Sequence, residues 1–285
     1  YLKRSEVFSD QEFYKTQEEN LQKHFHNGGR QNMSVADSSF DTWLDGYVMG
    51  IPNRKVSIYT EGALCALMLD IHMLNKSGGQ VSLRNMMTKL YLEYACKGKG
   101  LSEENYIHEL IAFGGEKALA IVENHLYATK DFRASLEEVM ALVGLQVHEQ
   151  ENSNVLASKL GVKGLIQKDG FHIKQVQVNS VADQSKIAEG DIILTIDGAE
   201  INKDLLESLK SKDAIVMKLK RRFETIDIDV SLNTQSYYPI YKIVYNIRIW
   251  SQVFVFHPPS IHDQDAFHIV LYYKMKIYHH YLLHA

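Results

Sequence analysis

The segment from Val56 to Ile71 constrains the fold of this chain more than any other. A short run rich in β-branched residues leads into Tyr59-Thr60-Glu61-Gly62, and a helical pattern that is apolar on almost all sides follows. Surface helices keep a polar face, so a helix without one is expected among other helices. The sequence therefore predicts a helical domain around this helix, with polar side chains at the helix entrance.

The length and composition set broad limits on the kind of protein. A chain of 285 residues is long enough for about two domains. Its 45% hydrophobic and 23% charged residues are typical of globular proteins, and a net charge of −4 gives no reason to expect nucleic-acid binding. Since no run of about 18 apolar residues occurs, no membrane span is predicted. The first residue is Tyr1 rather than Met, so we expect a piece of a longer protein, of unknown compartment.

Residues 1–148 follow helical patterns separated by short polar loops, which predicts an all-helical domain. Ser38 with Asp41, and Ser82 further on, resemble residues that open helices. His24 and His26 flank Phe25 on the first helix, and we expect both to be solvated. Cys65 and Cys96 are interpreted as buried small hydrophobic residues without a disulfide or metal role.

The pattern changes near Asn152, where alternating apolar residues begin. Strands are expected around Phe171–Val178 and Ile192–Ile196, with two more before residue 232. Asp197-Gly198 is typical of a tight turn. The sequence thus predicts a compact β-rich domain with short helices over residues 152–232.

Residues 233–285 form a tail rich in Tyr, Phe, Ile and His that fits neither domain and is expected to pack poorly. His279, His280 and His284 lie in it, and the last two are one helical turn apart, a spacing that allows a shared metal. No carboxylate or thiolate lies nearby to complete such a site, so we predict no metal ligands in this chain.

The β-rich segment resembles a PDZ domain of the type found in bacterial proteases. The resemblance rests on residues 160–162, on residues 179–183, and on the run Ile187-Ala188-Glu189-Gly190-Asp191 that continues to Gly198. It implies an α+β fold, a partly open β-barrel, that binds peptide or protein C-termini along a sheet edge. The carboxylate-binding loop would be Leu160, Gly161 and Val162. The alternative is a PDZ domain that serves only as a spacer.

The helical half is similar to the region after the zinc site in the glycyl-aminopeptidase family, metallopeptidase family 61. The similar residues are 38–44, 55–71 and 81–87. The resemblance implies a thermolysin-like, all-α C-terminal domain of a gluzincin, a zinc metallopeptidase that hydrolyses N-terminal peptide bonds, with small residues such as glycine preferred. In the intact enzyme zinc is held by an H-E-x-x-H helix and a downstream glutamate.

The sequence departs from this family at the zinc motif, because it contains no H-E-x-x-H. The nearest approach is His108-Glu109-Leu110-Ile111-Ala112, in which Ala112 cannot bind a metal. His108 and Glu109 are therefore interpreted as ordinary helix residues. We expect the zinc ligands in an N-terminal catalytic portion that this chain lacks and that would be its partner.

Two residues at the entrance of the central helix are candidates for the site. The family resemblance implies that Tyr59 stabilises the oxyanion of a tetrahedral intermediate. The alternative is a half-buried Tyr that bonds to backbone. Glu61 is a candidate for binding the amino group of the substrate, although an acid in the first turn of a helix also has an ordinary electrostatic explanation.

The first hypothesis is thus a C-terminal fragment of a glycyl-aminopeptidase-like enzyme that is inactive by itself. The second is a stand-alone PDZ module that captures peptide C-termini. The third is a degenerate pseudo-peptidase. An in-frame H-E-x-x-H upstream favours the first hypothesis, and a start codon directly upstream favours the second.

Overall fold

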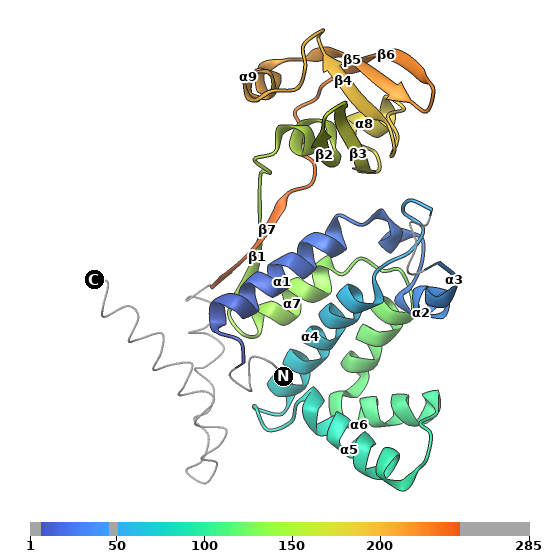
Figure 1. The fold of residues 1–285 in the computed structure, drawn as a ribbon. Coiled ribbons are helices and arrows are strands. Elements are labelled where there is room, and N and C mark those ends of the chain that lie inside the picture. The colour runs from blue at the N-terminus through green and yellow to red at the C-terminus, as the bar shows by residue number, and fades with distance from the viewer. Residues whose placement is uncertain (1–6, 46–50, 246–285) are drawn as a thin grey trace, which may run out of the picture.

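The computed structural model describes residues 7–45 and 51–245. They form a helical region followed by a sheet-containing region, and a two-stranded antiparallel ribbon joins the two (Figure 1). The predicted order of a helical domain and then a β-rich domain is confirmed. Among the helices of these residues, none combines the length and the apolar character needed to cross a membrane.

The helical region is built around α4, the central helix predicted above. α4 contacts α1, α5, α6 and α7, and it buries Leu64, Cys65, Met68 and Leu69 among their side chains. An apolar helix is stable here because other helices remove its surface from water. The helices of this region are α1 (Asp10–Phe25), α2 (Val35–Phe40), α3 (Thr42–Asp45), α4 (Ile58–Lys76), α5 (Leu83–Glu93), α6 (Glu103–Val122) and α7 (Arg133–Ala141).

The start of α2 corrects one prediction. The helix begins at Val35, and the hydroxyl of Ser34 accepts a hydrogen bond from the Asp37 amide at 3.0 Å. The Ser-x-x-Asp spacing therefore works as a cap four residues before the expected place. Ser38 lies inside the helix instead, where its hydroxyl accepts from the Val56 amide at 3.2 Å. The helix start expected at Ser82 is confirmed, since α5 begins at the next residue.

The sheet-containing region holds an antiparallel sheet of order β2-β3-β4-β5-β6. Its inward residues form one core that includes Phe171, Ile193 and Met217. Asp197 and Gly198 both have positive φ, as the predicted tight turn requires. The elements are β2 (Val162–Gln167), β3 (Gly170–Val176), α8 (Val181–Gln184), β4 (Ile192–Ile196), α9 (Lys203–Ser208), β5 (Ala214–Arg221) and β6 (Glu224–Ser231).

The ribbon consists of β1 (Leu145–Gln150) and β7 (Ile240–Tyr245). Tyr237 is buried in the core of the sheet, and Tyr241 of β7 is buried in the core of the helical region. The expectation that the tail packs poorly is therefore wrong for residues 237–245. Residues 246–285, with the tail histidines, lie outside the described residues.

Candidate active site

A cavity of about 650 Å³ lies between the helical region and the sheet. Its lining residues come from the end of α1, from the first turn of α4, and from β2 and β3. They include Gln22, Lys23, His26, Tyr59, Lys163 and Gln175. A cavity of this volume is in the range of small-ligand sites and has room for a short peptide.

Hydrogen bonds from three segments fix the entrance of α4 at this cavity. The side chain of Asn27 donates to the Lys55 carbonyl at 3.2 Å, and Ser38 holds the Val56 amide. Ser57 then caps α4, since its hydroxyl accepts from the Thr60 amide at 3.4 Å. These contacts set the direction in which the first turn of α4 presents its side chains to the cavity.

Tyr59 is the predicted catalytic residue, and it lies in this first turn. Its side chain lines the cavity and is 75% exposed. Among the described residues its hydroxyl has no hydrogen-bond partner, so the alternative of a half-buried Tyr bonded to backbone does not describe it. The phenol is thus free to donate to a ligand in the cavity. Its proposed catalytic role stays a prediction.

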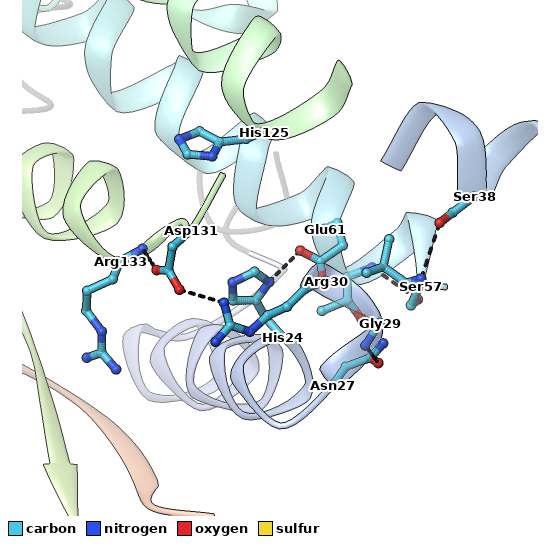
Figure 2. A network of polar contacts seen from close by, with 12 residues as sticks. His24, Asn27, Gly29, Arg30, Ser38, Ser57, Glu61, His125, Asp131 and Arg133 are labelled. Carbon is cyan, nitrogen blue, oxygen red and sulfur yellow. Dashed lines mark hydrogen bonds and ion pairs between the residues drawn. The ribbon is translucent and has the colours of Figure 1, made fainter. Parts of the chain in front are cut away.

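Glu61 also borders the cavity, but its carboxylate lies against a histidine. His24 Nδ1 is 2.5 Å from Glu61 Oε2, and both side chains are at most 2% exposed (Figure 2). Phe132 packs against the His24 ring at a centroid distance of 4.3 Å. The second carboxylate oxygen is the one left for other contacts. The substrate-binding role of Glu61 stays a prediction.

The expectation that His24 and His26 are solvated is wrong. His24 is 0% exposed and His26 is 8% exposed. A signal for His24 was present in the sequence, because it follows Leu21 by three residues and therefore shares the buried face of α1. The partners of both histidines lie far along the chain, so no local pattern identifies them.

The donor atoms in this neighbourhood do not fit zinc. His125 uses both ring nitrogens, one against the Lys130 carbonyl and one against the Ser135 hydroxyl. Asp131 accepts from Arg30 and from the Arg133 amide, while His24 Nε2 has no partner in the described part of the chain (Figure 2). A structural or catalytic zinc needs at least three protein ligands, and no group of three or more suitable side chains occurs in the described part of the chain.

His26 and Lys163 form the opposite side of the cavity. Lys163 Nζ donates to His26 Nδ1 at 2.6 Å, and His26 Nε2 donates to the Pro239 carbonyl at 2.8 Å. Burial, followed by the charge of Lys163, lowers the pKa of His26 to about 4, so the ring is neutral at pH 7. The side-chain amide of Gln175 donates to the backbone carbonyl of His26 at 2.5 Å. Sequence reasoning identified none of these residues as part of a site.

A β-bulge turns Lys163 toward the cavity. The register between β2 and β3 shifts between Lys163 and Gly164, and such a shift re-aims the side chain at the bulge. A Cβ at Gly164 would lie 2.1 Å from the His172 carbonyl oxygen and 2.7 Å from the Phe171 ring. Only glycine therefore permits this close approach of the two strands.

The predicted peptide-binding loop lies outside the residues that line the cavity. Leu160 and Val162 are 0% exposed, and Gly161, with φ of 76°, donates from its amide to the Ala157 carbonyl. A Cβ on Gly161 would lie 2.3 Å from Ser180 Cβ. The loop is thus tightly packed within the sheet-containing region.

The remaining candidates have ordinary surroundings. His108 and Glu109 lie on α6, and Glu109 accepts from Lys89 at 2.7 Å, which confirms their interpretation as helix residues. Cys65 is buried as expected, and burial raises the pKa of its thiol. Cys96 is exposed, so its predicted burial is wrong.

Comparisons with known proteins agree with this architecture. The M61 glycyl aminopeptidase family model matches residues 1–65, and the PDZ domain model matches residues 136–221. None of the curated proteins matches this sequence. An aminopeptidase N family protein from Idiomarina loihiensis is 22% identical over 86% of this chain, with a TM-score of 0.76. The matched part covers 44% of that protein, so the chain spans less than half of its length.

Two solved PDZ domains are similar over smaller parts. The HtrA3 PDZ domain bound to a phage-derived ligand is 15% identical and covers 36% of this chain and 93% of its own, with a TM-score of 0.24. The PDZ domain of EpsC from Vibrio cholerae is 9% identical and covers 34% of this chain and 95% of its own, with a TM-score of 0.23. Residues 1–65 are thus similar to part of the M61 glycyl aminopeptidase family, and residues 136–221 are similar to PDZ domains.

Proposed function

We propose that this chain is the C-terminal part of a zinc metallopeptidase that resembles glycyl aminopeptidase and hydrolyses N-terminal peptide bonds in the intact enzyme. The observation that carries the proposal is the position of Tyr59. It lies within the matched residues 1–65, and its hydroxyl, which has no partner among the described residues, lines the cavity. In this assignment the helical region is the thermolysin-like C-terminal domain, and the five-stranded sheet belongs to the partly open barrel of a PDZ domain.

In this proposal Tyr59 donates a hydrogen bond to the oxyanion that forms when water attacks the peptide carbonyl. Such donors act because they are already oriented where negative charge develops. The oxygen of Glu61 that does not face His24 would accept from the amino group of the substrate. No step is assigned to zinc, because the described residues do not provide its ligands. The chain by itself is therefore proposed to be inactive.

Zinc content and activity of two proteins test this proposal. The first is the chain as it stands, assayed on glycyl and alanyl anilides. The second is the same chain extended upstream in its reading frame to include an H-E-x-x-H segment. We expect stoichiometric zinc and turnover only in the extended protein. Turnover with bound zinc in the 285-residue chain, or an upstream frame without the motif, would contradict the proposal.

The role of Tyr59 is tested in the extended protein. Tyr59→Phe removes one donor to the oxyanion and is expected to lower kcat about 10²- to 10³-fold with little change in zinc content. Tyr91→Phe is the matched control, because Tyr91 is also exposed but lies on α5, outside the cavity. Equal kcat values for the two variants would remove Tyr59 from the mechanism.

A second function, peptide binding by the PDZ domain, is favoured by the position of β2. This strand is at the edge of the sheet, and its Leu165 and Ile166 are 61% and 66% exposed. A sheet edge with exposed apolar side chains can pair with an extended peptide, whose carboxylate would meet Leu160, Gly161 and Val162. Binding of labelled C-terminal peptides, followed by fluorescence anisotropy, tests this function. Unchanged affinity in Ile166→Lys would contradict it.

A further inference from the structure

The cavity contains Lys163, which has no carboxylate partner among the residues that the structure describes. Lys163 Nζ contacts a neutral imidazole, His26 Nδ1 at 2.6 Å, and lies 4.4 Å from the centre of the Tyr238 ring. In the described part of the chain it forms no ion pair with Asp or Glu. The ammonium group therefore has donor capacity left on the side that faces the cavity.

The rest of the lining adds positive charge. Lys23, on α1, reaches the cavity from the helical side, and the described residues give it no carboxylate partner either. Glu61 is the one acidic residue of the lining, and His24 already occupies one of its oxygens. Two cations from opposite sides thus face one cavity whose acid is already paired.

We propose that this cavity is a binding site for the carboxylate of a small ligand such as a short peptide, with Lys163 and Lys23 as the counter-charges. Burial lowers the pKa of Lys163 to about 8, so Lys163 is protonated in most molecules at pH 7. An anionic partner would stabilise this charged form. The inference does not require the peptidase reaction. The site is also separate from the packed loop of Leu160, Gly161 and Val162.

A lysine-specific NMR titration of the 285-residue chain tests the site directly. The chain is labelled with ¹³Cε-lysine, and Lys163→Met assigns the Lys163 signal. The probes are acetyl-Gly-Gly-Phe, its C-terminal amide, and acetyl-Gly-Glu-Phe-amide, all acetylated so that no aminopeptidase can cleave them. A carboxylate beside Nζ stabilises the charged form, so we expect saturating acid peptide to raise the Lys163 pKa by about one unit.

The three peptides distinguish the source of the carboxylate. A shift with acetyl-Gly-Gly-Phe alone identifies a C-terminal carboxylate, and a shift with the glutamate peptide identifies a side-chain carboxylate. Both outcomes support the site. No shift with any peptide, or the same shift with the neutral amide, would overturn it. A peptide that binds the PDZ edge without moving the Lys163 titration also counts against the inference.

Affinity measurements on variants complete the test. Lys163→Met and Lys23→Met are each expected to weaken binding of the acid peptide about tenfold, since each removes one charge-assisted contact. Lys163→Arg keeps the charge and should retain most of the affinity, which separates a binding effect from a folding defect. Lys174→Met is the matched control on β3, outside the cavity lining. Wild-type affinity in both Lys163→Met and Lys23→Met would refute the proposal.

Discussion

Two histidines at the end of α1 have opposite partners, although only Phe25 separates them. His24 meets the carboxylate of Glu61 inside the helical region, while His26 meets the ammonium of Lys163 beside the cavity. Successive residues of a helix point about 100° apart, so residues two positions apart point about 200° apart. The two rings therefore face different parts of the molecule. The side chain that each histidine contacts therefore determines what the histidine contributes to the structure. The carboxylate of Glu61 is buried together with His24, whereas the ammonium of Lys163 leaves positive charge at the cavity.

The largest expected effect comes from breaking the buried pair of His24 and Glu61. Glu61→Ala removes the one polar partner that His24 has among the described residues, and loss of one member of a buried pair costs on the order of 3–5 kcal/mol. Urea unfolding followed by circular dichroism measures the loss. Glu138→Ala is the control, since Glu138 pairs with Lys117 at the surface and should cost less than about 1 kcal/mol. Similar losses in both variants would mean that burial does not separate the two kinds of pair.

Acid should act on the other pair. The pKa of His26 is about 4 in the folded chain and near 6.5 in the unfolded chain, so the unfolded state binds more protons between these values. The contribution of His26 to the free energy of unfolding is therefore fully present above pH 6.5. It is lost as the pH falls toward 4, which lowers the free energy of unfolding by on the order of 3 kcal/mol. Urea unfolding at a series of pH values measures this slope.

His26→Gln isolates the contribution of His26. Burial also lowers the pKa of His125, which adds a slope of the same sign in both proteins. The free energy of unfolding of the variant should therefore change less between pH 4 and 6.5 than that of the wild type. The difference between the two slopes is the contribution of His26. Parallel curves for the variant and the wild type would show that His26 does not titrate as its surroundings require.

A smaller effect is expected from the bulge that aims Lys163. Gly164→Ala places a Cβ against the His172 carbonyl and should destabilise the chain by about 2 kcal/mol through strand displacement. Gly62→Ala is the matched control, because a Cβ there meets nothing within 4 Å and the residue lies in α4. It should stabilise the chain by about 0.5–1 kcal/mol. A neutral Gly164→Ala would mean that the strands can separate without cost.

The sequence predicts the structural features that residues close together in the chain determine. The apolar pattern of α4, the start of α5 after Ser82 and the turn at Asp197-Gly198 are local, and the structure confirms them. The sequence also places Tyr59 at the entrance of this apolar helix, and the structure shows it in the first turn of α4 at the cavity, while its catalytic role stays a prediction. Repeated motifs still mislead, since Ser34 and Ser38 both have Asp three residues later and Ser34 is the cap.

The partners in the site could not be predicted, because they are distant in the sequence. Glu61 lies 37 residues from His24, and Lys163 lies 137 residues from His26. Their pairing depends on how the helical region and the sheet are placed, which no helical or strand period encodes. The burial of Tyr237 and Tyr241 has the same cause, because each is covered by a different core.

The ribbon of β1 and β7 has a further consequence. Gln150 and Ile240 are paired residues, so the chain leaves for the sheet-containing region and returns from it at neighbouring points (Figure 1). Paired Cα atoms in antiparallel strands are only about 4.5–5.5 Å apart. The sheet-containing region between these two residues is thus inserted at the tip of a hairpin, and a two-residue turn could replace it without moving either strand. Because two strands connect this region to the helices, any rotation of the region would act on both strands at once.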